Sequence, residues 1–332
     1  ATGVPNPANA AMAVVQLPGN QNQRALTPAR LPSGEWQASL TLQAPKEAVQ
    51  DLNLHLFAGY IPKGAVEWKE VSVKLLPGYA PPSRPVQVVV IDSQPPRPGP
   101  ALASARHYAA EIDKACANAK RTDIVVLPEN FNKSKVVPVA PVRLDSEYMK
   151  AIREAARRNR TYVAGSVYEE REGVAFNAAF LIDRKGEYAG YYRKTHLTIG
   201  EMLYSDLGRG EEIKVLITDF GKVAIPVCFD FHYPELPRMM ALAGAELVLV
   251  PFAADGRLKE DARQRGTEFS GKTFVMENRI PVVFAATLGS TAQPSLIIDQ
   301  NGVVLARSDS QKHTIRAVVD LEQVAGDPGW RG

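Results

Sequence analysis

The fold is decided by the stretch Lys222-Val-Ala-Ile-Pro-Val-Cys228, which Phe-Asp-Phe-His-Tyr-Pro-Glu235 follows directly. The first part is an apolar run of strand length, and the second part breaks that run and opens a helix-like stretch. A thiol at the end of a buried strand, just before a helix, lies where backbone N–H groups can stabilise an anion. Free cysteines are also among the most often buried residues, so Cys228 taken alone is more typical of a packing residue.

Outward from this stretch, apolar and amphipathic runs alternate along most of the chain. Short continuous apolar runs are typical of buried strands, and longer amphipathic runs are typical of helices. The predicted strands are 85–92, 123–129, 162–170, 223–227, 247–252 and 281–286, and the predicted helices are 101–119, 146–160, 234–243 and 259–278. This alternation predicts an α/β fold in which two layers of strands pack on each other and helices cover the outside.

Two segments follow a different rule. Residues 181–188 and 296–305 each place polar turn residues between two apolar runs, which predicts β-hairpins. The sheets should therefore be mixed rather than purely parallel.

The first part of the chain differs from the rest. Period-2 runs at 36–42, 52–57 and 66–76, separated by Gly and Pro turns, predict a small antiparallel β domain over residues 1–76. Prolines then predict a linker at 77–85, which leaves 86–332 as the main domain. Trp36 and Trp68 could stack on a sugar ring, but aromatic residues at alternating strand positions are more typical of a core.

Composition restricts the class of protein. The 332 residues are 45% apolar and 23% charged, as in soluble globular proteins. A net charge of +3 is too small to indicate nucleic-acid binding, and the basic clusters at 157–160 and 263–265 are typical of solvated helix faces. No apolar run approaches the length of a membrane span.

Cysteine content and the start of the sequence bear on the compartment. The two cysteines, Cys116 and Cys228, provide no disulfide framework, and Cys116 lies between alanines in a predicted helix, where packing is its expected role. The sequence begins at Ala1 and contains no signal segment. We expect export with a signal removed before Ala1, in preference to a cytoplasmic location.

Two charged residues lie in settings as distinctive as that of Cys228. Glu129 ends a predicted strand, so it should project at the same rim as the cysteine, and Lys194 follows another strand. Either residue alone is typical of a solvated loop. Together the three groups supply what hydrolysis of an unactivated C–N bond requires: a nucleophile, a base that returns the proton, and a cation for the oxyanion.

At this point the chain resembles the nitrilase superfamily of carbon–nitrogen hydrolases. The resemblance covers about residues 86–325. It rests on Leu127-Pro-Glu129, Tyr192-Arg-Lys-Thr-His-Leu197, Val227-Cys-Phe-Asp-Phe-His-Tyr-Pro-Glu235, Glu277-Asn278 and Ile298-Asp-Gln-Asn-Gly302. It implies a four-layer αββα sandwich and a Glu-Lys-Cys triad at Glu129, Lys194 and Cys228. The second glutamate of the family falls on Glu201.

The resemblance also implies a mechanism without metal or other cofactor. Glu129 takes the thiol proton, Cys228 attacks the carbonyl carbon, and Lys194 with the backbone N–H of Phe229 holds the oxyanion. Water then cleaves the thioester. Glu201 is expected to position Lys194 or the substrate. The expected pocket is small and partly polar, and its expected lining is Phe131, Tyr204, His232 and Phe252.

One departure from the family stands out. Many amidases of this family have Arg four residues after the cysteine, where this chain has His232, and this change should alter the ion-pairing of Asp230 and Glu235. A metal site at His196, Asp230 and His232 has no short ligand spacing to support it.

The segment after Cys228 is similar to the amidase and N-carbamoyl branches, whereas true nitrile hydrolases usually have Trp-Glu or Gly-Glu after the cysteine. Primary amides or ureido compounds are therefore the expected substrates, with ammonia or an amine released. Acyl transfer to an amine and a catalytically silent scaffold are the alternatives. The resemblance further implies a homo-oligomer, for which the apolar helix 234–243 offers a surface.

Residues 64–74 resemble the closing strand of carbohydrate-binding β-sandwiches. We expect the first domain to be a structural appendage or a docking module for a protein or glycan partner.

Overall fold

The computed structural model describes most of the chain. The described residues are 11–16, 23–25, 27–39, 53–58, 67–74, 83–93, 101–117, 121–131, 141–203, 205–253, 260–286, 293–309 and 311–322. They divide into two compact units, the first within residues 1–82 and the second within residues 83–324. This division falls inside the predicted linker.

The first unit contains short antiparallel strands. Among its described residues, β1 (Ala11–Gln16) pairs with β2 (Gln23–Ala25) and with β5 (Asn53–Ala58), and β3 (Thr27–Arg30) pairs with β4 (Trp36–Ser39). The small antiparallel β domain is therefore confirmed, although its first three strands were not predicted. The strand predicted at 66–76 is wrong over its described part, because residues 67–74 contain no strand.

The two tryptophans of this unit differ from the expectation of a core. Trp36 is 39% exposed, and Trp68 is half-buried. Trp36 lies on the two-stranded β3–β4 hairpin, and a lone hairpin has little apolar surface with which to cover a large ring.

The second unit begins with a mixed sheet. Its described strands pair in the order β10-β9-β8-β7-β6-β18, and β11 also pairs with β9. They are β6 (Pro85–Ile91), β7 (Ile124–Val126), β8 (Tyr162–Arg171), β9 (Val174–Ile182), β10 (Tyr188–Arg193), β11 (Leu207–Gly208) and β18 (Thr314–Asp320). Strands β6, β7 and β8 run parallel, so the segments that follow them leave from one edge of the sheet.

The second sheet has the order β12-β13-β14-β15-β16-β17 among the described residues. Its strands are β12 (Leu216–Ile217), β13 (Lys222–Ala224), β14 (Leu247–Phe252), β15 (Val282–Ala286), β16 (Leu296–Ile298) and β17 (Val304–Arg307). Strands β13, β14 and β15 are parallel, whereas β16 and β17 form the predicted hairpin. The expectation of mixed sheets is confirmed in both.

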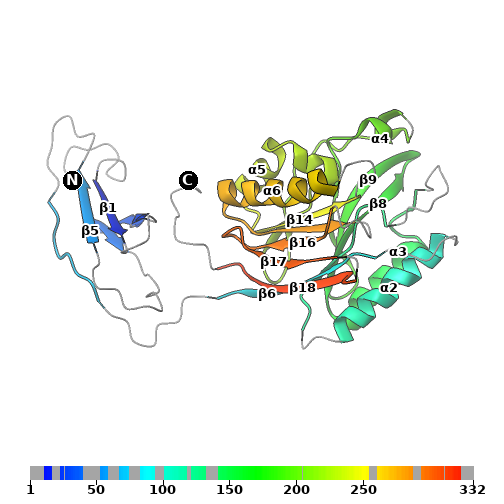
Figure 1. The fold of residues 1–332 in the computed structure, drawn as a ribbon, viewed down its shortest axis with the longest axis horizontal. Helices are drawn as coiled ribbons and strands as arrows, with labels where there is room; N and C mark the ends of the chain where they lie inside the picture. The colour runs from blue at the N-terminus through cyan, green and yellow to red at the C-terminus, as the bar shows by residue number, and fades with distance from the viewer. Residues whose placement is uncertain are drawn as a thin grey trace. The chain divides into compact units, whose positions relative to one another are not determined.

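Helices cover the outer faces of the two sheets (Figure 1). Helices α2 (Ala101–Ala117) and α3 (Glu147–Asn159) lie beside the first sheet, and α5 (Glu235–Leu242) and α6 (Glu260–Asn278) lie beside the second. The short helix α4 (Ile199–Leu203) follows β10. The result is the expected αββα sandwich.

The period-2 pattern of β6 explains the layers. Val88 and Val90 belong to the core between the two sheets, whereas Val89 and Ile91 belong to the core beneath α2 and α3. Successive side chains of a strand point to opposite faces, so a strand buried on both faces is apolar throughout. The continuous apolar run of β6 thus explains why the first sheet lies between the two cores.

None of the helices in the described ranges is long and apolar enough to cross a membrane.

The hairpin between β9 and β10 turns at Gly186, where the chain packs on α3. Gly186 has a φ of +81°, and a Cβ there would lie 2.6 Å from the carbonyl oxygen of Arg153. Gly173, in the turn between β8 and β9, has a φ of +82° but no atom within 4 Å of an added Cβ. The two glycines share a backbone conformation and differ in the space around them.

We therefore expect Gly186→Ala to lower the free energy of unfolding by about 3 kcal/mol, from left-handed strain and a backbone clash together. Gly173→Ala should cost only about 1 kcal/mol, from strain alone. Urea unfolding of both variants measures the difference. Equal losses would show that the Gly186 turn can move away from α3 without cost.

Candidate active site

The turn that carries Cys228 leaves the second sheet earlier than predicted. Strand β13 ends at Ala224 rather than at 227. Pro226 explains the difference, because proline has no N–H to donate to a neighbouring strand. The chain then enters a 3-10 helix, η1 (Cys228–His232), which precedes α5, and Cys228 itself has a φ of +47°. The cysteine thus lies in a strained turn between a strand and a helix.

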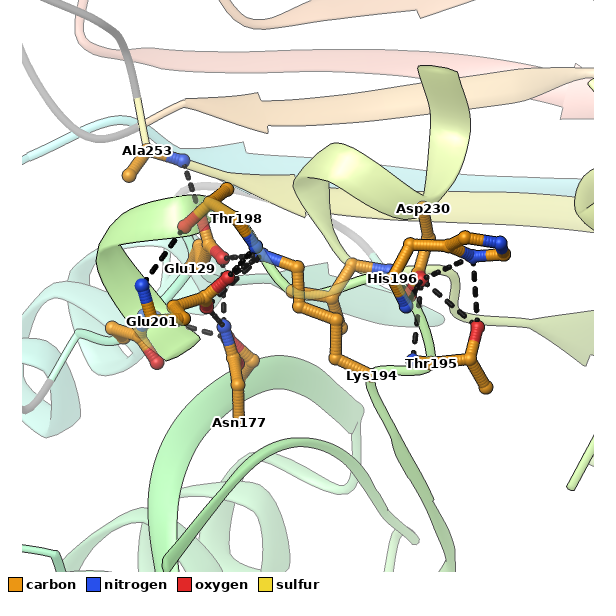
Figure 2. A network of polar contacts seen from close by, with 12 residues as sticks. Glu129, Asn177, Lys194, Thr195, His196, Thr198, Glu201, Asp230 and Ala253 are labelled. Atoms are coloured by element: carbon orange, nitrogen blue, oxygen red, sulfur yellow. Dashed lines mark hydrogen bonds and ion pairs between the residues drawn. The ribbon is translucent and has the colours of Figure 1, made fainter. Parts of the chain in front are cut away.

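The two acidic residues expected at the site converge on Lys194 (Figure 2). Glu129 follows β7, Lys194 follows β10, and Glu201 lies on α4. The ammonium nitrogen Nζ of Lys194 is 3.0 Å from Oε1 of Glu129 and 2.9 Å from Oε2 of Glu201. All three side chains are almost wholly buried, and Lys194 is only 1% exposed. A buried ammonium is stable here because it has two carboxylate partners.

Asn177 and Ala253 hold the carboxylates in place. The Nδ2 group of Asn177, in β9, donates to Oε1 of Glu129 at 2.8 Å and to Oε1 of Glu201 at 2.7 Å. The backbone N–H of Ala253, after β14, donates to Oε2 of Glu129 at 2.7 Å. Both oxygens of Glu129 therefore have a donor, Asn177 from the first sheet for Oε1 and Ala253 from the end of a strand of the second sheet for Oε2.

Glu201 is held by its own helix terminus. Its Oε2 accepts the N–H of Thr198 at 2.8 Å, and its N–H donates to Oγ1 of Thr198 at 3.2 Å. This reciprocal arrangement is a capping box, which begins α4 and orients the carboxylate at once.

Cys228 completes the cluster. The charges of Glu129 and Lys194 act on its thiol, and the backbone of Ala253 lies near it. Burial raises the pKa of the thiol, the charge of Glu129 raises it further, and the charge of Lys194 lowers it. The net effect of these three influences is a raised pKa.

The charges of Lys194 and Glu201 stabilise each other. Burial opposes the charged form of Lys194, but Glu129, Cys228 and Glu201 outweigh burial and raise its pKa. Burial likewise opposes the charged form of Glu201, but Lys194, the N–H of Thr198 and Asn177 outweigh it and lower its pKa. A neutral thiol thus lies beside a carboxylate that can take its proton and a cation that can stabilise an oxyanion.

The remaining predicted site residues lie in different surroundings. Phe131 is 2% exposed and stacks with Tyr148 in the core beneath α2 and α3. This packing accounts for its burial, and a contact with substrate stays a prediction. Phe252 ends β14 and packs edge-on against Phe284.

His232 and Phe229 lie on the 3-10 helix after Cys228, with ring centroids 5.6 Å apart. The residue His232 as a whole is exposed. Partial burial of its imidazole, together with the charge of Lys194, lowers the pKa of His232. Tyr204 lies outside the described residues.

One polar residue of the site was missed. Asn177 is the one polar residue in the apolar run Val-Ala-Phe-Asn-Ala-Ala-Phe-Leu-Ile at 174–182, and it lies in the buried part of that run, where a polar residue requires a partner. The expected effect of His232 on the ion-pairing of Asp230 and Glu235 stays a prediction. The side chain of Asp230 is bonded to Val227, Tyr192, Thr195 and His196. Within the described ranges, no group of three or more His, Cys, Asp or Glu side chains could hold a metal ion.

The raised pKa of Cys228 predicts a protonated thiol at pH 7. A raised pKa means that the thiolate forms only above the ordinary cysteine value of about 8.5. The difference in ultraviolet thiolate absorbance between the wild type and Cys228→Ala, followed against pH, measures this. We expect no difference at pH 7 and a rise only in alkaline solution. A thiolate signal at pH 7 that disappears in Cys228→Ala would contradict the prediction.

Known proteins share parts of their sequence and their fold with this chain. A model of the carbon–nitrogen hydrolase family matches residues 90–328. An omega-amidase of Xenopus tropicalis is 25% identical over 236 residues, which are 64% of this chain and 84% of that protein. A probable hydrolase of Bacillus subtilis is 30% identical over 188 residues, or 53% of this chain. That match spans only 36% of the length of the Bacillus protein.

Solved structures share the fold. A carbon–nitrogen hydrolase from Helicobacter pylori superposes with a TM-score of 0.63 at 24% identity, over 72% of this chain and 91% of that one. An amidase from Nesterenkonia superposes with a TM-score of 0.58 at 22% identity, over 72% and 90%.

Proposed function

Because the chain belongs to the carbon–nitrogen hydrolase family, we propose that it cleaves the C–N bond of a primary amide or an N-carbamoyl group through a thioester on Cys228. The observation that carries the proposal is the convergence of three groups. The charge of Glu129 acts directly on the thiol of Cys228, and Glu129 is itself paired with Lys194. Together the three groups supply a nucleophile, a base and a cation for an oxyanion.

The first half of the proposed reaction forms the thioester. Glu129 takes the proton from the thiol as Sγ of Cys228 attacks the carbonyl carbon. The carbonyl oxygen becomes an oxyanion, which Lys194 and the N–H of Phe229 stabilise. The C–N bond then breaks, and the leaving ammonia or amine receives the proton held by Glu129.

The second half restores the enzyme. Glu129 takes a proton from a water molecule as that water attacks the thioester carbon. The C–S bond breaks, and the proton returns to the sulfur of Cys228. The acid product leaves, so that each proton taken by Glu129 is returned within the same half-reaction.

The preference for amides and ureido compounds over nitriles has two supports. The segment Phe229-Asp-Phe-His-Tyr-Pro-Glu235 is similar to that of the amidase and N-carbamoyl branches. In addition, proteins named omega-amidase and amidase are among the relatives and structural neighbours.

Ammonia release tests the proposal. A panel of primary amides, N-carbamoyl amino acids and nitriles is offered to the wild type, to Cys228→Ala and to Cys116→Ala. We expect release from one amide or carbamoyl class, a loss of at least about 10³-fold in Cys228→Ala, and wild-type rates in Cys116→Ala. Cys116 is the matched control because it is the second cysteine and lies on α2, where it packs against the core beneath α2 and α3, whereas Cys228 packs against the core between the sheets.

Two other results have clear meanings. Release from nitriles alone would contradict the proposed substrate class. No release from any class by folded protein would contradict hydrolysis, and would favour acyl transfer to an amine or a silent scaffold.

We also propose that the protein forms a dimer or a higher oligomer through α5 and α6. These neighbouring helices expose large apolar side chains: Met239, Leu242, Phe269 and Met276. Exposed apolar patches of this kind are typical of protein interfaces. The proposed occupant is a second copy of the chain, in keeping with the closed symmetry of most soluble oligomers.

Sedimentation of the full chain measures the assembly. We expect a species of at least twice the chain mass of 36.2 kDa. A change of Leu242 to Glu, on the exposed face of α5, should shift the protein toward the monomer because a buried unpaired charge is unfavourable. A wild-type protein that sediments only at 36.2 kDa would remove the proposed interface.

A further inference from the structure

Asp230 is the second residue after Cys228 and is fully buried, with 0% exposure. Its oxygen Oδ2 accepts the N–H of Val227 at 3.0 Å and the hydroxyl of Tyr192 at 2.8 Å. Its oxygen Oδ1 accepts the N–H of His196 at 2.8 Å, and both the N–H and the hydroxyl of Thr195, at 3.3 and 3.1 Å. One carboxylate thus receives these five hydrogen bonds, and the ring nitrogen Nδ1 of His196 also lies 3.3 Å from Oδ1.

These donors lie next to Cys228 and next to Lys194 in the sequence. Val227 immediately precedes Cys228, and Thr195 and His196 immediately follow Lys194. Figure 2 shows Asp230 facing Thr195 and His196. Asp230 therefore joins the turn that carries the thiol to the loop that carries the ammonium, although it contacts neither reacting group.

The cysteine turn needs such support. A residue other than glycine at a φ of +47°, as Cys228 is, costs about 1–2 kcal/mol and persists only where the surroundings fix it. The Val227 N–H bonds to Oδ2 of Asp230, and the Asp230 N–H bonds to the Val227 carbonyl at 3.0 Å. This pair of bonds holds the two ends of the turn around Cys228 together.

The chemistry of the donors matters for the test. The N–H groups of Val227, Thr195 and His196 can only donate, and they lie on both oxygens of Asp230. Asparagine has the same shape but must present an NH₂ group to one of the two sets. Whichever way it is oriented, at least one buried backbone N–H loses its acceptor.

We propose that Asp230 is a positioning residue, whose carboxylate fixes the Cys228 turn against the loop after Lys194 and so sets the thiol beside Glu129 and Lys194. This role rests on the proposed function for its effect on turnover. Its effect on the reactivity of the thiol does not depend on any substrate.

Asp230→Asn is the central variant. We expect kcat to fall by about 100-fold on the compound from which the wild type releases ammonia fastest. Small errors in the placement of a reacting atom reduce the rate by that much. KM should change by less than about threefold, since Asp230 is fully buried and so is not expected to contact the substrate. Tyr192→Phe removes a single donor to Oδ2 and should lower kcat by only about threefold to tenfold.

Asp123→Asn is the matched control. Asp123 is also buried, at 1% exposure, and accepts the N–H of Gln87 at 2.9 Å together with bonds from Arg121 and Arg184. It lies before β7, whereas Glu129 lies after it, so its loss weakens the fold at the far end of the same strand. We expect Asp123→Asn to lower the unfolding midpoint and to leave kcat within about twofold of the wild type.

Alkylation by iodoacetamide tests the positioning without a substrate, with each cysteine followed by peptide mass spectrometry. In Asp230→Asn the rate at Cys228 should fall about tenfold, because Glu129 is no longer placed to take the proton, while the rate at Cys116 stays unchanged. Unchanged alkylation of Cys228 in folded Asp230→Asn overturns the proposal, even if the wild type hydrolyses none of the compounds offered. If Asp230→Asn does not fold, Tyr192→Phe decides: wild-type kcat and alkylation overturn the proposal, and a graded loss of either supports it.

Discussion

The buried ammonium of Lys194 is the interaction on which the rest of the site depends. A charge removed from water requires partners, and Lys194 has two carboxylates that arrive from different elements, one after β7 and one on α4. Each carboxylate in turn needs donors, which Asn177, Thr198 and Ala253 supply. The ammonium thus holds the two carboxylates in place, and the donors to the carboxylates hold them in turn.

The sandwich makes this arrangement possible. Strands β6, β7 and β8 of one sheet and β13, β14 and β15 of the other are parallel, so that each sheet sends its connecting segments out at one edge. Glu129 leaves the first sheet, and Cys228 and Ala253 leave the second. The bond from Ala253 to Glu129 shows that the two edges meet. The proposed base and the proposed nucleophile therefore belong to different sheets, and the packed core between the sheets brings them together.

Much of this could be predicted from the sequence, for a physical reason. Continuous apolar runs mark strands that are buried on both faces, and Glu129 and Cys228 each come after such a run. Lys194 instead follows the largely half-buried strand β10. The end of β13 at Ala224 was harder to place, because Pro226 lies inside an otherwise apolar run. Asn177 carries no charge and follows no strand end, and the role of Asp230 depends on loops that lie 35 residues apart in the chain. Local sequence patterns predict the strand or loop in which a residue lies. The partners of its side chain depend on contacts with segments that are distant in the sequence.

The order of strands in the first sheet has a consequence for biosynthesis. Strand β6 opens the second unit, and its neighbour on one side, β18, is the last strand of the described chain. Until Thr314–Asp320 has left the ribosome, β6 lacks the partner that covers this edge. An uncovered strand can pair with a strand of another chain, and contacts between distant residues form slowly. The nascent protein thus passes through a stage at which most of its sandwich has been synthesised but one edge of the sheet remains open to association.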